Sequence, residues 1–477
     1  MAREPQPQNQ DPIRKVVKPE PEPAPDELVK RDPFRDGLAD TGTPAAGRTT
    51  LQEARRKGPV GWLQVLGPGL ITGASDDDPS GIGTYVQVGS QFGFGLLWTA
   101  LFTFPLMTAV QELCSRIALQ TGVGLGVSLR RKFPTSVVGI AILGLLVANT
   151  LNVGADLGAV AAGGALLSRG ILKPLWLVVP VALLIIAMEL FVTYAAIFKI
   201  FKWLTLALFA YVIAAFFAHP PLGEVVRSTF VPHFEFSRDF IMAIVAVFGT
   251  TISPYLFFWQ ASSEVDELRG AGHASKAGRR GLRRSELRAA RLDIMVGMAF
   301  SNLVMYFIIL TSAAVLHAHG KTDIQTAEQA AAALEPLAGP LAFIVFSVGM
   351  IGSGLLAIPI LSGSASYAAK EFLGLGGNLA SKPRHRPTFY TMLVLATLVG
   401  VAMNFIHLDP IRALYITAVV NGMVAPPLLA LIVLLGADHR IMKRYASGRL
   451  SLALTTITTA FMGVAALAMV ATLVTGA

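Results

Sequence analysis

Long apolar stretches dominate the pattern of hydrophobic and polar positions in this chain. Each stretch has about 20 apolar residues, the length that an α-helix needs to cross the hydrocarbon core of a bilayer. Charged or Gly/Pro-rich segments separate the stretches, so we predict an all-α polytopic membrane protein with eleven membrane segments. The expected segments are residues 62–90, 94–119, 137–165, 174–192, 196–217, 239–263, 292–316, 340–369, 388–406, 410–435 and 451–475.

Residues 1–58 do not follow this pattern. They are rich in Pro, Glu, Arg, Lys and Asp and contain few aromatic or β-branched residues, so they cannot bury enough surface to fold alone. No early apolar region follows the N-terminal charges, which argues against a secretory signal peptide. We expect a disordered cytoplasmic tail over 1–58, followed by a transmembrane transporter domain over 59–477.

Lysine and arginine gather in alternate connections between the expected segments. The run at Arg130–Lys132 and the Arg-rich connection 269–291 lie on one side by this count, whereas the intervening connections carry few basic residues. Because cytoplasmic loops carry the excess of Lys and Arg, the N-terminus is expected in the cytoplasm. An odd number of crossings then places the C-terminus outside, in a multi-pass protein of the inner (cytoplasmic) membrane.

Composition agrees with a membrane protein. Hydrophobic residues make up 53% of the chain, charged residues 14%, and the mean hydropathy is +0.59. The net charge of +9 is accounted for by the basic connections, so a nucleic-acid partner is not predicted. The single cysteine, Cys114, excludes an internal disulfide framework and is expected in the core. No Walker A sequence, nucleophile elbow or pair of catalytic acids is present, so we predict neither an enzyme nor a cofactor.

Two of the expected segments are interrupted at their middle by a proline. The first carries Asp78-Pro79-Ser80-Gly81 and the sixth carries Ser253-Pro254-Tyr255. A proline lacks the backbone N–H, so each helix should break there and leave carbonyl groups facing a cavity. Breaks at equivalent places in two blocks of five segments predict an inverted-repeat transporter with its site between them. The first repeat covers 59–217, the second 239–435, and 451–475 is an extra helix.

An acid at the first break favours a cationic substrate. Asp78 would repel an anion, so a metal ion fits the break better than an amino acid does, and an organic cation is a weaker alternative. A carboxylate near mid-bilayer costs at least about 2.5 kcal/mol, which makes it a functional-site hypothesis by default. Asp76, Asp77 and Asp78 lie about 100° apart on a helix and cannot all reach one ion. We expect Asp78 to be the principal ligand and Asp76 or Asp77 to line the approach.

The two motifs resemble those of the Nramp family of divalent metal transporters over roughly residues 60–475. That family has a LeuT-type 5+5 inverted repeat with broken helices 1 and 6, which carry Asp-Pro-Gly-Asn and Met-Pro-His. In this chain the first motif becomes Asp78-Pro79-Ser80-Gly81 and the second Ser253-Pro254-Tyr255. Loss of the soft methionine ligand and of bulk at Gly81 suits Mg²⁺, which prefers oxygen ligands and retains water. The chain therefore resembles the Nramp-related magnesium transporter branch.

The resemblance and the breaks together imply a ligand set. The metal is expected to contact side chains or carbonyls of Asp78, Ser253, Gly81, Ala74, Thr250, Asp77 and Asn421. A relay or second layer is expected from Asp156, Tyr255 and Asn152. Asn149, Asn152 and Asp156 share one helix face, and Asp156 is equally open to a purely structural interpretation.

Proton coupling is expected to be weak or absent, because the resemblance places Ala159 where the family has a glutamate and Tyr255 where it has a histidine. We thus predict a monomeric secondary transporter that takes up Mg²⁺, and also Mn²⁺, with divalent metal ions and the lipid bilayer as its partners. One alternative is a proton-coupled importer of Mn²⁺ and transition metals. A less favoured alternative is a membrane metal sensor that does not transport.

Overall fold

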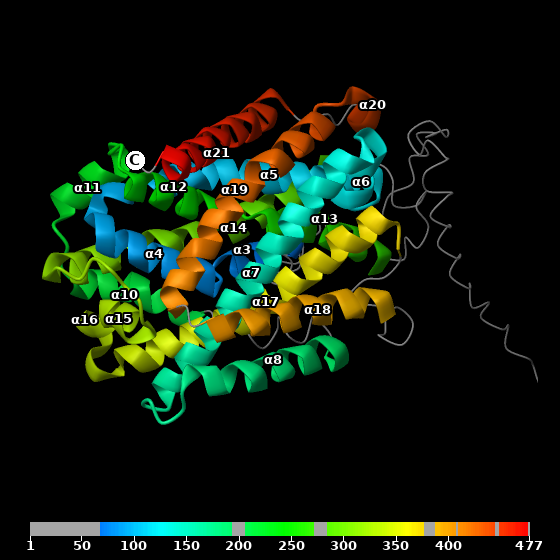
Figure 1. The fold of residues 1–477 in the computed structure, drawn as a ribbon. Helices are drawn as coiled ribbons and strands as arrows, with labels where there is room; N and C mark the ends of the chain where they lie inside the picture. Colours follow the sequence, from blue (N-terminus) through cyan, green and yellow to red (C-terminus); the bar gives the residue numbers. More distant parts are fainter. Residues whose placement is uncertain are drawn as a thin grey trace, which may run out of the picture.

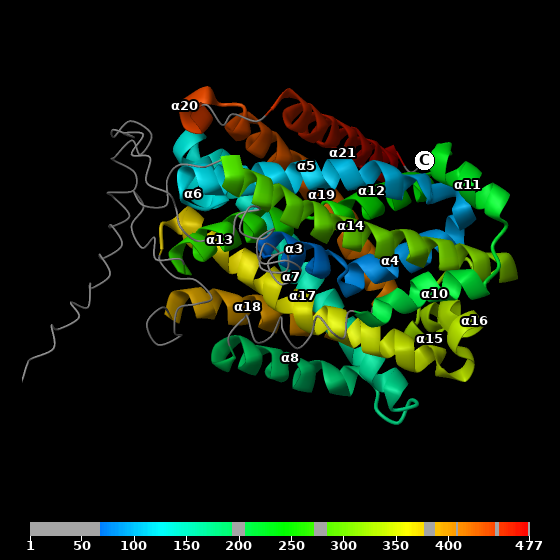
Figure 2. The same cartoon turned by 180° about the vertical axis from the view of Figure 1, so that it is seen from behind.

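The computed structural model describes residues 67–192, 206–270, 284–375, 387–406, 409–443 and 448–475. Within these ranges every regular secondary-structure element is a helix (Figures 1 and 2). The expected disordered tail over 1–58 and most of the Arg-rich connection lie outside the described residues, so these two expectations stay predictions.

The helices follow the expected order of segments. The first block contains α3 (Pro68–Asp76), α4 (Pro79–Phe92), η1 (Gly93–Leu96), α5 (Trp98–Thr121), α6 (Leu125–Lys132), α7 (Thr135–Leu167), α8 (Pro174–Phe191), η2 (Leu206–Leu208) and α10 (Phe209–Phe217). The connection to the second block holds α11 (Leu222–Phe230). The second block and the C-terminal part contain α12 (Arg238–Thr251), α13 (Pro254–Gly270), α14 (Arg284–Val315), η3 (His317–His319), α15 (Ala327–Ala331), η4 (Ala332–Leu334), α16 (Glu335–Ala338), η5 (Gly339–Leu341), α17 (Ala342–Leu373), α18 (Pro387–Met403), η7 (Asn404–Ile406), α19 (Pro410–Gly436), α20 (His439–Met442) and α21 (Arg449–Thr475).

Among the described residues, the long apolar helices are fewer than the eleven expected crossings. In the described part of the chain, seven helices are long and apolar enough to cross a membrane. The count becomes eight if Pro79–Leu96 and Trp98–Thr121, which meet at 109°, form one bent span. Each of the eleven expected segments contains helix, but the exact number of crossings stays a prediction.

Both predicted helix breaks are confirmed. The α3 helix ends at Asp76 and α4 begins at Pro79, whereas α12 ends at Thr251 and α13 begins at Pro254. Each proline is the first residue of the second half-helix, a position whose N–H has no partner within that half-helix, although in an uninterrupted helix it would donate to the carbonyl four residues earlier. The two prolines therefore end one half-helix and start the next.

The short helix α3 is held against α14. The carboxylate of Asp293 in α14 accepts hydrogen bonds from the backbone N–H groups of Gly67 at 2.8 Å, Gly69 at 2.8 Å and Leu70 at 3.0 Å. The first N–H groups of a helix have no intrahelical acceptor, and a carboxylate there also faces the positive end of the helix dipole. Asp293 therefore satisfies the start of α3 from a distant part of the chain.

Glycines let the backbones of α3 and α14 approach closely. A methyl group at Gly73 would lie 2.2 Å from the carbonyl carbon and oxygen of Gly297, and one at Gly297 would lie 2.2 Å from the carbonyl oxygen of Gly69. Real side chains are not accommodated at such distances. The contact between the two helices thus requires glycine on both sides.

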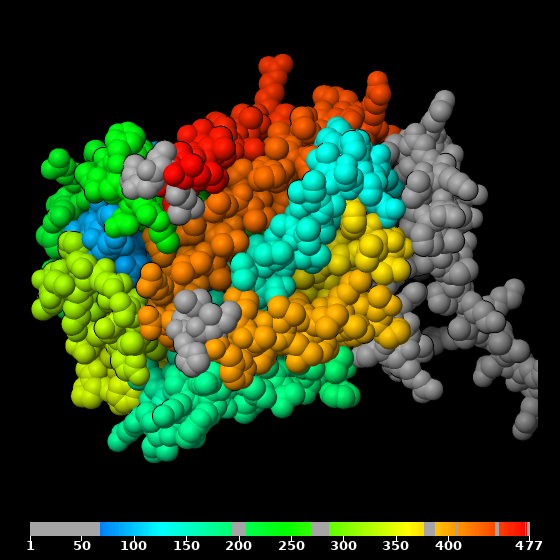
Figure 3. Space-filling view, in the orientation of Figure 1, coloured from blue at the N-terminus to red at the C-terminus, as the bar shows by residue number. Residues whose placement is uncertain are grey.

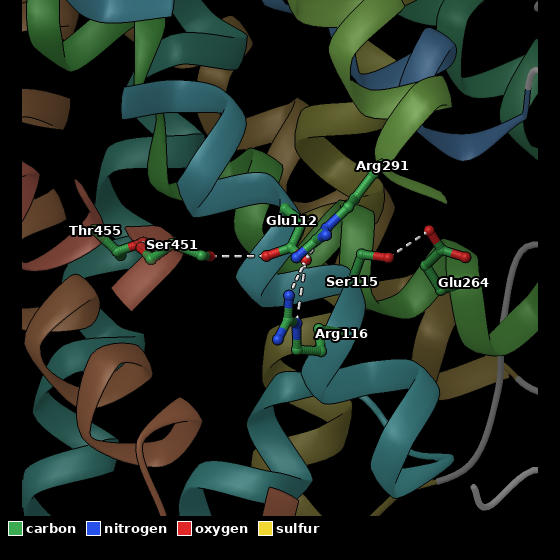
Figure 4. A network of polar contacts seen from close by, with 7 residues as sticks. All are labelled: Glu112, Ser115, Arg116, Glu264, Arg291, Ser451 and Thr455. Atoms are coloured by element: carbon green, nitrogen blue, oxygen red, sulfur yellow. Dashed lines mark hydrogen bonds and ion pairs between the residues drawn. The ribbon is translucent and has the colours of Figure 1, made fainter. Parts of the chain in front are cut away.

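A buried ionic network joins four helices at another part of the bundle (Figure 4). Glu112 in α5 accepts from Arg116 in the same helix, from Arg291 Nε of α14 at 2.8 Å and from Ser451 Oγ of α21 at 2.8 Å. Nearby, Ser115 Oγ of α5 donates to Glu264 of α13 at 2.8 Å. A buried carboxylate with several donors is satisfied, so the network fixes α21 to the bundle.

The broken helices lie inside this bundle. In the space-filling view, α7, α18, α19 and α21 form one continuous face of the molecule (Figure 3). Asp76, Asp77 and Asp78 are all buried, and so are Thr250 and Ser253 at the second break. The residues around both breaks are therefore shielded from the surroundings of the protein.

We predict that Gly73→Ala lowers the stability of the protein. The new methyl group would meet the Gly297 carbonyl at 2.2 Å, so α3 and α14 would have to separate, and overpacking of this kind costs about 1–3 kcal/mol. The measurement is the melting temperature of the detergent-purified protein. Gly223→Ala in α11 is the control, because no atom lies within 4 Å of its new methyl group. Equal melting temperatures for the two variants would contradict the close approach.

Candidate metal site at the two helix breaks

Each proline at a break leaves one backbone carbonyl without the N–H donor that it would have in a continuous helix. A side-chain hydroxyl donates a hydrogen bond to each of these two carbonyls. Pro79 cannot donate to the carbonyl of Ser75 four residues earlier, and the Tyr255 hydroxyl donates to it instead at 2.8 Å. Pro254 likewise leaves the carbonyl of Thr250, which accepts from Ser253 Oγ at 2.7 Å. The first of these bonds crosses from one break to the other.

Asp78 occupies the centre of the first break. Its Oδ1 accepts from the Gly81 N–H and from Ser80 Oγ, both at 2.7 Å, and so caps the start of α4. Its Oδ2 accepts only the longer bond from Tyr255, at 3.3 Å. One carboxylate oxygen is therefore held by the helix, whereas the other is weakly bound and available to a ligand.

Tyr255 brings the two breaks together. Its fully buried side chain starts from α13 and reaches both Ser75 and Asp78. Its own carbonyl accepts a 2.6 Å hydrogen bond from Ser364 Oγ of α17, which fixes the beginning of α13. The sequence predicted Tyr255 only as a relay or second-layer residue, and the structure gives it the contact between the breaks.

Gly81 keeps a small space open beside the first break. A methyl group at Gly81 would lie 3.2 Å from the carbonyl oxygen of Asp76, 3.3 Å from Thr250 Oγ1 and 3.4 Å from Tyr85 Cε2. The hydroxyls of Thr250 and Tyr85 are buried and lack a hydrogen-bond partner. Three oxygen-bearing groups from α3, α4 and α12 thus converge next to Asp78.

Asp77 and its neighbour Asp76 both contact α14. Ser301 Oγ of α14 lies 2.5 Å from Asp76 Oδ2 and 3.3 Å from Asp77 Oδ1, so both carboxylates face α14. Asp76 and Asp77 thus share the contact with Ser301, whereas Asp78 contacts Tyr255, and the expectation that the three acids cannot all reach one ion stays a prediction. Asp77 as a ligand of the same ion as Asp78 remains a prediction, and its hydrogen bond to α14 counts against it.

The polar residues of α7 approach the first break through Asp156. Its carboxylate lies close to Asp78 and to the backbone of Ser80, and both of its oxygens lack a hydrogen-bond partner. Asn152 is buried with an unpartnered amide, and Asn149 donates to the Leu361 carbonyl at 3.2 Å. Among the described residues no side chain forms a hydrogen bond with Asp156, and its role at the site stays a prediction.

The remaining predicted ligands stay predictions. Asn421 in α19 is fully buried, and neither its amide oxygen nor its amide nitrogen has a partner. Ala74 lies in the apolar cluster that also contains Tyr255, and only its carbonyl could bind a metal. Ser253 Oγ donates within its own helix end, to Gly249 or Thr250, and keeps its lone pairs for other use.

The site offers only oxygen and amide groups. In the described ranges, no group of three or more His, Cys, Asp or Glu side chains is arranged to hold a metal ion. A cation at the breaks would therefore be held by one or two carboxylates together with hydroxyl groups, carbonyls and water. Cys114 is buried in the core, as expected, and takes no part.

Sequence reasoning missed Asp293 and Ser301. Together with Gly297 these residues recur every four positions along α14 and form one narrow polar and glycine face in an apolar helix. Gly69 and Gly73 have the same spacing in α3. This matched spacing was the available signal that α3 and α14 pack together.

Comparison with known proteins gives consistent findings. The family described as "Natural resistance-associated macrophage protein-like" (Nramp) matches residues 69–472. The divalent metal cation transporter MntH of Yersinia enterocolitica is 26% identical over 315 residues, which cover 61% of this chain and 69% of that protein. The protein of the same name from Caldanaerobacter subterraneus is 23% identical and covers 81% of this chain and 87% of its own length.

Solved structures show the same fold. A manganese transporter of Eremococcus coleocola matches with a TM-score of 0.64 at 15% identity, over 85% of this chain and 86% of that chain. Mhp1, a nucleobase-cation-symport-1 family transporter, matches with a TM-score of 0.54 at 16% identity, over 90% of this chain and 93% of that chain. At these identities the likeness shows the LeuT-like fold alone.

We predict that Tyr255→Phe destabilises the protein. Loss of the hydroxyl leaves the buried Ser75 carbonyl without a donor, which costs about 1–3 kcal/mol. The measurement is again the melting temperature in detergent. Tyr211→Phe is the matched control, because the Tyr211 hydroxyl is buried without a partner and its removal should be neutral or stabilising. A Tyr255→Phe protein as stable as the control would contradict the bridge between the breaks.

Proposed function

Because the chain belongs to the Nramp family, we propose that it transports divalent metal cations, with Mn²⁺ as a substrate, through a site between its two helix breaks. It is a multi-pass membrane protein of a transporter family and not an enzyme. The observation that carries the proposal is Asp78, a buried carboxylate with one weakly bound oxygen between two interrupted helices.

Manganese is a better supported substrate than magnesium. The relatives are named divalent metal cation transporters and one solved structure is a manganese transporter, whereas no finding supports a magnesium-specific branch. Carboxylate, hydroxyl and carbonyl oxygens suit Mn²⁺ and Mg²⁺ alike. We therefore propose Mn²⁺ transport with Mg²⁺ as a competitor, in place of the preference for Mg²⁺ expected from the sequence.

We assign the ligands from the oxygen-bearing groups that lie at the two helix breaks. Asp78 Oδ2 is the principal ligand, and Thr250 lies beside the space that Gly81 leaves open. The lone pairs of Ser253 and the carbonyl of Ala74 complete the proposed shell together with water. Asn421 would enter it as an uncharged ligand with free amide atoms.

Binding of the metal would replace the Tyr255 hydroxyl as the partner of Asp78 Oδ2. A cation on Oδ2 competes with the Tyr255 hydroxyl, which still has the Ser75 carbonyl to accept its hydrogen. Oδ1 can keep its bonds to Gly81 and Ser80, so the start of α4 stays capped. Metal binding then needs no unwinding of the helix.

For the membrane orientation and the oligomeric state, we propose what the sequence predicts. We place the N-terminus in the cytoplasm and the C-terminus outside, following the distribution of Lys and Arg. The functional unit is a monomer, since each chain contains both breaks. A metal sensor would need a cation site but not transport, so uptake by the purified protein separates these two functions.

We also propose that metal transport is coupled to proton movement and that Asp156 carries the proton. Weak or absent coupling was expected from the sequence, but the comparisons do not support it. Asp156 lies near Asp78, and a cation at Asp78 favours the ionised form of a neighbouring carboxyl group, so Asp156 can release a proton when the metal binds. The protein thus resembles the proton-coupled alternative more than the uncoupled one.

We predict that Asp78→Asn abolishes Mn²⁺ uptake into proteoliposomes but preserves folding. Asparagine retains an oxygen that can cap α4, whereas it lacks the negative charge that attracts the metal. The measurements are ⁵⁴Mn²⁺ uptake, with and without Mg²⁺ as competitor, and the melting temperature. Asp323→Asn, an exposed acid outside the site, is the control. Undiminished uptake by Asp78→Asn would refute the proposed site.

We predict that Asp156→Asn uncouples proton entry from metal entry. The variant keeps the polar side chain but cannot carry a proton, so Mn²⁺ should enter with a smaller acidification of the liposome lumen. A trapped pH dye at clamped membrane potential measures the acidification and ⁵⁴Mn²⁺ measures the metal. If the wild-type protein moves Mn²⁺ without acidification, the coupling proposal fails and the uncoupled expectation stands.

A further inference from the structure

The helix α8 carries a buried acid that the proposed transport site does not use. This helix lies at the edge of the bundle beside α18, and most of its side chains are not buried (Figures 1 and 2). Its buried face includes Val178, Ala182, Ile185 and Glu189, which have the spacing of one helix face. Three of these residues are apolar, whereas Glu189 is an acid with only 5% of its surface exposed. An ionisable side chain inside a membrane-spanning helix is a functional-site hypothesis by default.

The carboxyl group of Glu189 has a single hydrogen-bond partner. Ser362 Oγ of α17 lies 2.6 Å from Glu189 Oε1, whereas Oε2 is buried and has no partner. Among the described residues, no basic side chain forms an ion pair with Glu189. An unpaired charge in apolar surroundings costs a large amount of free energy, and a bound proton removes this cost.

The other titratable groups near α8 do not neutralise Glu189. The helix packs against α7, α17, α18 and η7, whose titratable side chains are Asp156, Tyr367, Lys370, Glu371 and Tyr390. The Tyr367 hydroxyl donates to Asp266 of α13, and Glu371 accepts from the Gly126 N–H. The ammonium group of Lys370 lies over the Tyr367 ring, 4.8 Å from its centre. Tyr390, near the start of α18, lies close enough to Glu189 for the charge of the acid to affect its hydroxyl.

Ser362 suits both protonation states of Glu189. Its hydroxyl oxygen lies 2.6 Å from Glu189 Oε1 and 2.9 Å from the carbonyl oxygen of Ile358 in the preceding turn. When Glu189 is ionised, the hydroxyl donates its hydrogen to Oε1. When Glu189 is protonated, the acid donates to Ser362 Oγ, and the hydroxyl donates to the Ile358 carbonyl. Glu189 can therefore gain and lose a proton while Ser362 remains hydrogen-bonded to it.

Polar side chains lead from the first helix break towards the acid of α8. Asp156, Asn152 and Asn149 lie on one face of α7, and both amide groups are buried with an oxygen that has no partner. The Asn149 amide donates to the Leu361 carbonyl at 3.2 Å, and Leu361 precedes Ser362 in α17. Along the axis of α7, Asn149 is about 10 Å from Asp156, in the direction of the end that we expect in the cytoplasm.

We propose that Glu189 is a proton-binding residue of the transport pathway, which takes up the proton that accompanies the metal and releases it to cytoplasmic water. The inference rests on the proposed function, since only a proton-coupled transporter delivers a proton to this residue. Uptake converts the carboxylate into the neutral acid, and release restores the carboxylate. Glu189 lies close to the end of α8 at Phe191, which is the cytoplasmic end in the orientation expected from the distribution of Lys and Arg.

The test compares Glu189→Gln with the wild-type full-length protein in proteoliposomes. Glutamine keeps an acceptor for the Ser362 hydroxyl but cannot bind a proton, so the variant should fold. We expect Mn²⁺ uptake driven by the membrane potential to persist in Glu189→Gln, whereas the acidification of the lumen per Mn²⁺ ion is lost. The measurements are ⁵⁴Mn²⁺ and a trapped pH dye at clamped potential. Glu224→Gln, at an exposed acid of α11, is the matched control and should acidify the lumen as the wild-type protein does.

Infrared difference spectra of the detergent-purified protein between acidic and alkaline pH test the proton on Glu189 directly. We expect the carbonyl band of a protonated carboxyl group that disappears at alkaline pH and is absent from Glu189→Gln. If Glu189→Gln does not fold, Glu189→Asp shifts the same band and so assigns it. A band of this residue that persists at every pH would overturn the proposal, because the acid would then hold its proton permanently.

The outcomes separate this inference from the proposed function. Acidification by Glu189→Gln equal to that of the wild-type protein would refute the role of Glu189 and leave Mn²⁺ transport intact. Mn²⁺ uptake without acidification by the wild-type protein would refute both proton coupling and this role. Absence of Mn²⁺ uptake by the wild-type protein would refute the proposed function, and the infrared spectra would still decide whether Glu189 exchanges a proton.

Discussion

Two prolines remove backbone hydrogen bonds where no water is available to replace them, and the geometry of both breaks follows from how the freed carbonyls are satisfied. The Thr250 carbonyl finds its donor locally, in Ser253. The Ser75 carbonyl accepts its hydrogen bond from Tyr255, which lies at the other break. The missing N–H at Pro79 thereby leads to a hydrogen bond between the two breaks, at the place where the metal is proposed to bind.

The position of α3 depends equally on α14. A helix of nine residues has little stability of its own, because helix nucleation is costly and most helical stability in proteins comes from packing. Asp293 caps its start, Gly73 and Gly297 bring the backbones together, and Ser301 binds the acids at its end. The geometry of the first break therefore depends on contacts with α14 as well as on the residues of α3 and α4.

The sequence was sufficient to predict features that are local in the chain. Proline and the charge of Asp78 determine where each helix stops and what kind of substrate the break attracts, so both breaks and the LeuT-like fold were correctly predicted. The direction of the Asp77 side chain could not be predicted from the sequence, because it depends on Ser301, which is 224 residues away along the chain.

The preference for Mg²⁺ was inferred from the loss of one methionine, and hard oxygen ligands alone do not separate Mg²⁺ from Mn²⁺. The count of crossings depends on bends, such as the 109° angle before α5, that hydropathy does not contain.

In the proposed site Asp78 would cap a helix and also bind the metal, and its two oxygens would divide these two tasks between them. Oδ1 serves the helix through Gly81 and Ser80, and these bonds do not depend on whether a metal is present. Oδ2 has only the 3.3 Å bond from Tyr255, so a cation can replace that donor with little loss. When the cation leaves, the Tyr255 hydroxyl is still held within reach by its 2.8 Å bond to Ser75. The empty and the loaded break can therefore share nearly the same backbone, which lowers the structural cost of binding and releasing the ion.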